Sequence, residues 1–434
     1  MLSIAYFVVL GALAVLSTSA KRIFIICGFY TFYAFLTVLD EGSVPRLGPV
    51  TVYRALYLIL AISLITRWIK DPALSLQMRR CPFFSYTLLI VLLLASALYS
   101  QASQPFSGES GSLWGRFVVI SLFWMAAFHV QKESDLKIFA ATTVAVTIVL
   151  ASWVIWSAAH LDFQAYRGGV KSDQNYVSSF VMVGALPLLN SFFAAKHFFA
   201  RVGSLVLVFF VLFTCLLLAS RGMFAAFAVA AIATTISALR HRRRALITAG
   251  VVLIVTCGIA FLLPGGSSLI ARFNEGDLTT LNERTIVWSY SLKYFADSSV
   301  LRMMFGQGLG SDPPIINPVV PELGNYHNDY LRWLMDRGVV GLAAFLFFLY
   351  SVRRRIAHSD HPLKPVMMGW LALLLVSALS EAASDSHLFW IVLGIICASC
   401  ALTSRAGFSQ SLPVRSPEPI SSKPSVGSTI PRWV

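Results

Sequence analysis

Long apolar runs dominate the chain, and short polar segments separate them. A bilayer core of about 30 Å is crossed by roughly 20 helical residues. Runs near that length occupy residues 2–20, 23–39, 52–69, 83–99, 113–130, 137–158, 176–195, 203–219, 222–239, 245–264, 338–352, 364–383 and 386–403. Because only Lys21-Arg22 separates the first two, we expect an all-α polytopic membrane protein with about 12 (12–13) transmembrane helices. No basic residue precedes the first run, so we interpret it as a retained membrane helix and not as a cleaved signal peptide.

Composition supports this interpretation. Hydrophobic residues make up 57% of the chain and charged residues 12%, and the mean hydropathy is +0.73. A soluble domain carries roughly twice that charged fraction, which excludes a water-soluble globule. The net charge of +14 comes from basic residues scattered between apolar runs. They form no continuous basic stripe, so we expect no nucleic-acid partner.

The basic residues predict the orientation of the chain in the membrane. When the loops are assigned to alternating sides, 19 of the 34 Lys and Arg residues fall on one side and 12 on the other. With their acidic neighbours, the two sides carry net charges of +15 and −3. The positive-inside rule makes the first side cytoplasmic. The 73 residues of the loop 265–337 then lie on the outer face.

These patterns divide the chain into four parts. We expect transmembrane helices over 1–264 and 338–404, a large periplasmic loop over 265–337, and a disordered cytoplasmic tail over 405–434. The tail is rich in Ser and Pro and lacks periodicity. No repeated or inverted halves of the kind found in transporters are recognisable.

The large loop contains two stretches with helical periodicity. Residues 282–296 begin with Asn282 as a candidate N-cap and place Ile286, Tyr290 and Tyr294 on one face. Residues 325–337 are followed by Gly338, a candidate C-cap. The Gly- and Pro-rich stretch 306–322 between them predicts irregular structure. A loop of this length with its own helices is typical of a functional segment.

Several cations on the outer face are candidate anion ligands. Arg221 lies between two apolar runs, where it either snorkels to the headgroups or binds an anion. Arg284 lies in the first turn of its predicted helix, where a cation opposes the helix dipole, so helix formation does not explain it. Guanidinium groups bind phosphate oxygens in a bidentate manner, so a diphosphate is the ligand we expect. Further candidates are Arg167, Lys171, Arg272 and Lys293.

His327 is a candidate general base. It stands at the start of the second predicted loop helix, flanked by Tyr326 and Asn328. A histidine there is commonly only a polar helix-start residue. Its alternative role follows from an imidazole that titrates near neutral pH and can take a proton from a hydroxyl.

Metal and cofactor chemistry is not indicated by the sequence. There is no HExxH motif, no paired-Cys zinc spacing and no DxD-type pair of acids on the outer face. The CxxC spacing of Cys397 and Cys400 falls in an apolar run, so we expect both to be small buried hydrophobes. Asp173, Glu381 and Asp385 are single acids near the membrane edge. We therefore expect no cofactor and no metal.

Four stretches together resemble the bacterial O-antigen ligase and polymerase superfamily. The sequence HNDYLRWLMDRGVVGLAAF resembles that family's HN-x-Y-L signature with its following acid and glycines. SDQNYVSSFVMVGALPLL, LASRG, and NERTIVWSYSLKYF followed by FGQGLGS fit it in the same order. The resemblance covers about residues 170–350.

This resemblance implies a GT-C-like membrane fold and transfer of O-antigen from undecaprenyl diphosphate. The acceptor in the ligase branch is lipid A–core oligosaccharide, and the reaction takes place on the periplasmic face of the inner membrane of a Gram-negative bacterium. The resemblance also implies that Arg221 and Arg284 bind the diphosphate, that His327 is the base, and that the reaction is metal-independent and inverting. Asp173 or Asp385 is the next candidate for the base.

Two alternatives remain open from the sequence. O-antigen polymerases share these motifs, although the position of the loop and the compact size favour a ligase. A transporter or flippase of lipid-linked glycan belongs to another class, and it would show mid-membrane charges and repeated halves. The sugar, the linkage and the acceptor are not encoded in any motif found here.

Overall fold

The computed structural model describes residues 23–36, 46–47, 50–70, 82–98, 113–160, 174–218, 220–239, 283–320, 325–381 and 383–411, and all structural statements refer to these. The helices of the membrane part are α2 (Ile23–Leu36), α3 (Val52–Lys70), α5 (Phe83–Ala97), α6 (Leu113–His129), α7 (Glu133–His160), α9 (Gln174–Ala194), α10 (Phe198–Leu217), α11 (Arg221–Leu239), α17 (Asp329–Ala357), α18 (Lys364–Ser380) and α19 (His387–Ser411). Strands β1 (Arg46–Leu47) and β2 (Val50–Thr51) form one short antiparallel pair.

The prediction of an all-α polytopic membrane protein is confirmed. Within the described residues, five helices are long and apolar enough to cross a bilayer, and six shorter apolar helices accompany them. Each of these helices coincides with one of the apolar runs found in the sequence. The runs 2–20 and 245–264 lie outside the described residues, so the predicted total of about 12 stays a prediction.

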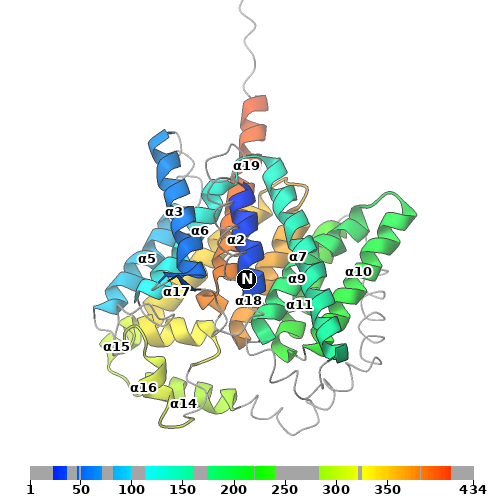
Figure 1. The fold of residues 1–434 in the computed structure, drawn as a ribbon. Helices are drawn as coiled ribbons and strands as arrows, with labels where there is room; N and C mark the ends of the chain where they lie inside the picture. Colours follow the sequence, from blue (N-terminus) through cyan, green and yellow to red (C-terminus); the bar gives the residue numbers. More distant parts are fainter. Residues whose placement is uncertain are drawn as a thin grey trace, which may run out of the picture.

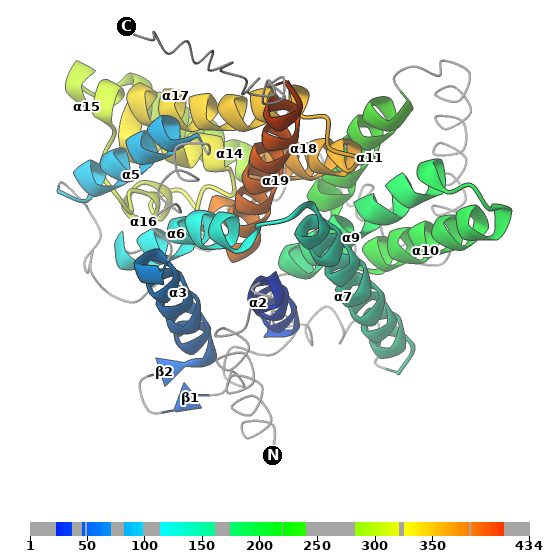
Figure 2. The same cartoon turned by 90° about the horizontal axis from the view of Figure 1, so that it is seen from above.

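Helices α18 and α19 occupy the middle of the bundle, as the view from above shows (Figure 2). Helix α11 packs along α18, and α6 packs along α19. Glycines allow both close approaches, because a Cβ atom at Gly369 would lie 2.0 Å from Thr234 Oγ1 and one at Gly394 would lie 2.2 Å from the Phe123 carbonyl oxygen. Small residues at such contacts are the usual means by which membrane helices pack closely.

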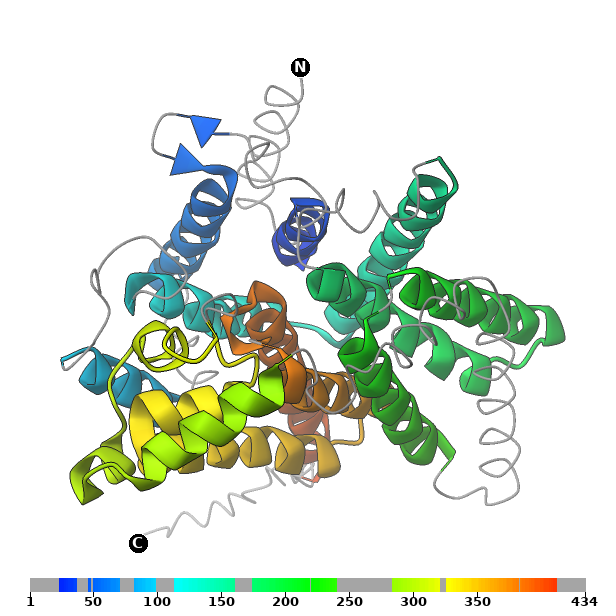
Figure 3. The ribbon, with the colours of Figure 1, turned by 90° about the horizontal axis from the view of Figure 1, so that it is seen from below.

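The described part of the large loop forms three helices, α14 (Arg284–Ala296), α15 (Val300–Phe305) and α16 (Asp312–Ile316). They gather at the end of the molecule opposite the C-terminal end of α19 (Figure 1) and cover the start of α17 when seen from below (Figure 3). Helix α15 was not predicted, and α16 lies in the stretch predicted to be irregular.

Helix α14 does not bury the face that its periodicity suggested. Ile286 and Tyr290 are exposed, whereas Val287 and Ser291 are buried. Val287 belongs to a small separate core with Ile315, Ile316, Val320, Tyr326, Leu331 and Met335. Asn282, the expected N-cap, lies outside the described residues, and Glu283 occupies the N-cap position with φ 63°. The partners of the loop core come from elements far along the chain, so helical periodicity alone could not identify the buried face.

Gly338 interrupts α17 as the sequence suggested. Its φ of 67° and ψ of −167° are not helical, so the helix bends between a short outer half and a membrane half. The bend leaves carbonyl groups of α17 without donors from within the helix. Main-chain N–H groups of the 306–310 turn donate to them instead. Gln307 N–H donates to the Met335 carbonyl at 2.7 Å, and Gly308 N–H donates to the Asp336 carbonyl at 3.1 Å.

A second glycine, Gly306, also allows the 306–310 turn to contact α17 closely. Gly306 has φ 86°, and a Cβ atom there would lie 2.3 Å from the Arg337 nitrogen. A Cβ atom at Gly338 would lie 2.3 Å from the Met304 carbonyl carbon. The two glycines therefore permit direct main-chain contact between the loop and α17.

The boundary of the C-terminal tail differs from the prediction. Helix α19 extends to Ser411, whereas the tail was predicted to be disordered from residue 405 onward. The apolar run ends near residue 403, but no helix-breaking residue follows at once, so the helix continues past the apolar segment. Residues 412–434 lie outside the described part of the chain.

Candidate functional site

Tyr326 anchors the segment that carries His327. Its side chain is fully buried in the small loop core. The Trp288 indole N–H donates to its carbonyl oxygen at 2.8 Å, and its hydroxyl lies 3.3 Å from Ser311 Oγ. Burial raises the pKa of the Tyr326 phenol, so it stays a neutral hydroxyl in this hydrogen bond. The residue before His327 is thus fixed on both its main chain and its side chain.

Hydrogen bonds of the residues on either side of His327 fix the turn in which it lies. Asn325 Oδ1 accepts from the His327 N–H at 2.7 Å, and Asn328 is the N-cap of α17, accepting from the Leu331 N–H at 3.1 Å. Asp329 accepts from the main-chain N–H and the hydroxyl of Ser384, at 2.6 and 2.8 Å. Helix α17 therefore begins at Asp329, two residues after His327, and His327 belongs to the turn that precedes it.

His327 has an unusual backbone conformation. Its φ of 47° lies in the left-handed region that residues with a Cβ atom seldom adopt. Such a conformation costs on the order of 1–2 kcal/mol, and the anchored neighbours hold it in place. The side chain is 21% exposed, less buried than those of Tyr326 and Asp329.

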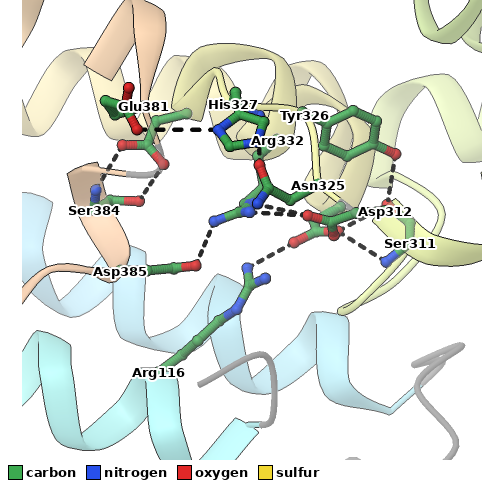
Figure 4. Close-up of polar contacts among 12 residues, drawn as sticks. Arg116, Ser311, Asp312, Asn325, Tyr326, His327, Arg332, Glu381, Ser384 and Asp385 are labelled. Atoms are coloured by element: carbon green, nitrogen blue, oxygen red, sulfur yellow. Dashed lines mark hydrogen bonds and ion pairs between the residues drawn. The ribbon is translucent and has the colours of Figure 1, made fainter. Parts of the chain in front are cut away.

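Arg284 and His327 approach the same carboxylate. Arg284 is the first residue of α14, and its Nη1 donates to the Ser380 carbonyl at 2.6 Å. Its Nη2 lies 3.6 Å from Glu381 Oε1, while His327 Nδ1 lies 4.0 Å from Glu381 Oε2 (Figure 4 shows the latter pair). Glu381 directly follows α18. Three separate elements thus bring a guanidinium, an imidazole and a carboxylate together.

The start of α11 lies beside this group. Arg221 is the first residue of α11, and a Cβ atom on the next residue, Gly222, would lie 2.5 Å from Ser380 Oγ. Ser380 is the residue whose carbonyl accepts from Arg284. The main chain of Arg221 is therefore close to the point where α14 meets the end of α18. The side chain of Arg221 lies outside the described part.

A mostly apolar pocket opens next to Glu381. Its lining comes from α9, α11, α18, the 3₁₀ turn Ala383–Asp385 and the region of α19. The polar lining residues are Asn175, Tyr176, Ser179, Ser377, Glu381 and Ser386, and the apolar ones are Val183, Met223, Leu373, Leu374, Ala383, Leu388 and Phe389. Two of the stretches noted in the sequence, SDQNYVSS and LASRG, thus contribute to or directly precede the same pocket wall.

A buried ionic network lies beside the site (Figure 4). Arg332 donates to Asp312, with Nη2 at 2.9 Å, and also to Asp385. Arg116 Nη1 donates to Asp336 Oδ2 at 2.8 Å. Burial raises the pKa of the Asp312 carboxyl, and the Arg332 guanidinium opposes that effect. The network ties α16 and α17 to α6 and to the turn before α19.

The structure brings together only some of the expected site residues. His327, Arg284 and the main chain of Arg221 meet at the end of α18. Lys293 is exposed in the last turn of α14, nine residues from Arg284 and so about 14 Å along the helix. Arg167, Lys171, Asp173 and Arg272 lie outside the described residues.

Two acids have contacts that the sequence did not suggest. Asp385, a candidate base, is paired with Arg332 and is not directed at His327. Glu381, interpreted only as an acid near the membrane edge, is the partner of both candidate residues. The one local signal for Glu381 is its position at the outer end of an apolar run.

The described cysteines are part of the packed interior. Cys27, Cys215, Cys397 and Cys400 are buried, as expected for Cys397 and Cys400. Among the residues that the structure describes, no three His, Cys, Asp or Glu side chains are grouped so that they could hold a metal ion.

Comparison with known families connects this site to a function. Residues 206–346, from within α10 to within α17, match the family model described as O-antigen ligase. No curated protein matches the chain. The matched range contains Arg221, Arg284 and His327, and the family indicates a glycosyltransferase-type enzyme that uses a lipid-linked glycan and a lipid acceptor. The chain is therefore a multi-pass membrane protein whose residues 206–346 match the O-antigen ligase family, which supports the resemblance to the O-antigen ligase and polymerase superfamily.

Proposed function

We propose that the protein is an O-antigen ligase that transfers O-antigen polysaccharide from undecaprenyl diphosphate to lipid A–core oligosaccharide. The reaction takes place on the periplasmic face of the inner membrane of a Gram-negative bacterium, in a GT-C-like fold. One observation carries the proposal: the Arg284 guanidinium and the His327 imidazole lie 3.6 and 4.0 Å from the two oxygens of Glu381, beside an apolar pocket. A cation, a base and an apolar cavity are what a lipid diphosphate donor requires.

Arg284 and Arg221 bind the donor diphosphate in this proposal. Arg284 is only 19% exposed, and its Nε is buried without a hydrogen-bond acceptor. A buried guanidinium donor without a partner is costly, and phosphate oxygens would satisfy it. The same arginines stabilise the negative charge that develops as the diphosphate leaves. Arg221 begins α11 beside the same helix end.

His327 acts as the general base. The acceptor hydroxyl attacks the anomeric carbon, the bond from that carbon to the phosphate oxygen breaks, and the lipid diphosphate takes the bonding electron pair. The hydroxyl proton passes to His327 Nε2, since Nδ1 faces Glu381. The diphosphate is a stable anion and needs no proton as it leaves. Attack opposite the leaving group inverts the anomeric centre, and no step requires a metal.

A polymerase would use the same lipid-linked donor and differ in the acceptor. We favour the ligase because the family model that matches is described as O-antigen ligase. Deletion in the native host separates the two. Loss of all long-chain lipopolysaccharide with accumulation of lipid-linked polymer identifies a ligase, whereas a core that carries a single repeat unit identifies a polymerase.

Transfer by reconstituted protein tests the mechanism. Proteoliposomes receive a lipid-diphosphate-linked glycan and lipid A–core, and the ligated product is measured for the wild type, His327→Ala and Arg284→Lys. Loss of a general base typically lowers the rate by 10²–10⁴-fold. Arg284→Lys should lose most activity, because an ammonium group lacks the planar fork of guanidinium.

The controls decide between a chemical and a structural effect. Arg302→Lys changes an exposed arginine of the same loop and should retain normal transfer. Activity should persist in EDTA. Normal transfer by His327→Ala, or loss in EDTA with recovery in Mg²⁺, contradicts the mechanism. Movement of the lipid-linked glycan across the bilayer without ligation would identify a transporter.

A further inference from the structure

Glu381 is placed to act on both proposed site residues. It follows the last residue of α18 in an extended conformation, with φ −144° and ψ 164°, and its side chain is 13% exposed. One carboxylate oxygen faces Arg284 and the other faces His327. A carboxylate between a cation and an imidazole can hold both in place, but the distances show that it holds neither tightly.

Both contacts of Glu381 are longer than a hydrogen bond. They measure 3.6 Å to Arg284 Nη2 and 4.0 Å to His327 Nδ1, whereas strong charge-assisted bonds are about 2.7–2.9 Å long. Within the part of the chain that the structure describes, His327 Nδ1 and Arg284 Nε are both buried without a hydrogen-bond partner. The carboxylate therefore stands between two donors that compete for it, and it also lines the neighbouring pocket.

We propose that Glu381 is a positioning residue that exchanges partners when the donor binds. This inference rests on the proposed function. In the empty site its carboxylate occupies the anion position of Arg284. A diphosphate carries more charge and matches the guanidinium fork, so it replaces the carboxylate there. Repulsion between the two anions then favours movement of Glu381 toward His327, where it accepts a hydrogen bond from Nδ1–H.

This exchange links donor binding to the action of the base. With Nδ1–H held by a carboxylate, the lone pair of Nε2 is directed toward the acceptor hydroxyl. The carboxylate also stabilises the imidazolium that forms when Nε2 takes the hydroxyl proton. Glu381 neither takes nor gives a proton in this step. The acceptor is therefore activated only when the diphosphate is in place.

Steady-state transfer by Glu381→Gln and Glu381→Asp in proteoliposomes tests the exchange, with the lipid-diphosphate glycan as the varied substrate. Glutamine keeps the size but loses the charge. We expect kcat to fall about 10–100-fold, with a donor KM that is unchanged or lower because the competing carboxylate is gone. In the glutamine variant the acidic limb of the pH–rate profile should move to lower pH, because the His327 imidazolium loses the carboxylate that stabilises it. Aspartate keeps the charge and should retain more of kcat than glutamine.

Glu133→Gln is the matched control, because Glu133 is 48% exposed and pairs only at the surface with Lys137. It should leave kcat, KM and the pH profile unchanged. A Glu381→Gln variant with normal kcat overturns the inference, as does an equal loss in both variants with an unmoved pH profile, which indicates a purely structural role. If His327→Ala is inactive while Glu381→Gln is fully active, only this inference fails. If His327→Ala is active, the proposed function fails first.

Discussion

Two groups of charged residues lie near each other at the outer end of the bundle, and they differ in how well they are paired. In the ionic network, Arg116 and Asp336 are 2.8 Å apart, and Arg332 and Asp312 are 2.9 Å apart. These four side chains are at most 7% exposed. In the candidate site the separations are 3.6 and 4.0 Å, and the side chains are 13–21% exposed.

This difference indicates which group is structural and which is functional. A buried charge needs a partner, and in the network Arg116 and Arg332 each have a carboxylate oxygen at 2.8 or 2.9 Å, although Arg116 Nε and Asp312 Oδ1 make no hydrogen bond within the described residues. In the candidate site the nearest described carboxylate oxygens are farther away, at 3.6 and 4.0 Å, and Arg284 Nε and His327 Nδ1 make no hydrogen bond to any described residue. Incomplete pairing next to a pocket is a cost to the empty protein that a bound anion would remove. Substitutions in the two groups should therefore affect different properties.

The largest expected effect is on stability, from Asp336→Asn in the network. The change leaves Arg116 and Arg337 buried without their carboxylate, and breaking such a pair typically costs about 3–5 kcal/mol. The free energy of unfolding in detergent measures it. Asp360→Asn, on an exposed residue, should change it by less than about 0.5 kcal/mol. Equal stability of the two variants would show that the ionic network does not stabilise the fold.

The next largest effect is expected at Gly338, where the loop contacts the bend in α17. Gly338→Ala places a Cβ atom 2.3 Å from the Met304 carbonyl carbon at a residue with φ 67°. We expect a loss of about 2–3 kcal/mol, together with reduced transfer, since the left-handed conformation and the overpacking each have a cost. Gly203→Ala in α10 is the control, because no atom lies within 4 Å of its added Cβ, and it should not destabilise. A tolerated Gly338→Ala would show that the bend is not required.

A smaller effect is expected within the candidate site. His327 has φ 47°, so His327→Gly should be more stable than His327→Ala by about 1 kcal/mol, although both lack transfer activity. Thermal unfolding of the two variants in the same detergent measures the difference. If alanine is equally stable, the backbone at this position is not strained.

The smallest effect is expected at the far end of α14. Lys293 is exposed and about 14 Å along the helix from Arg284, so Lys293→Ala should change the transfer rate by less than about twofold. Initial rates at subsaturating donor measure this. A large loss would show that the anion site extends along α14 as far as Lys293.

The sequence predicted the elements whose signals are local. Apolar runs identified the membrane helices, and Gly338 marked the end of the outer helix because only glycine adopts its conformation readily. His327 and Arg284 attracted attention because of their chemistry and their positions at predicted helix starts. Their proximity in the structure agrees with that interpretation, while their roles stay predictions.

The features that the sequence did not predict depend on contacts between distant parts of the chain. Glu381 lies 54 positions after His327, and no periodicity links the two. Arg116 and Asp336 are 220 positions apart. Asp385 was ranked as a candidate base because its ion pair with Arg332 could not be inferred from spacing. The buried face of α14 was misjudged for the same reason, since its partners lie on α16 and α17.

The separation between Arg116 and Asp336 has a consequence for biogenesis. Ribosomes add about 5–20 residues per second, so α6 emerges roughly ten to forty seconds before its partner acid is made. During that interval the guanidinium of Arg116 must stay hydrated at the membrane surface, because burial without a counter-ion is costly. Closure of the ion pair can therefore occur only after α17 has been synthesised, and it makes final docking of α6 a late event.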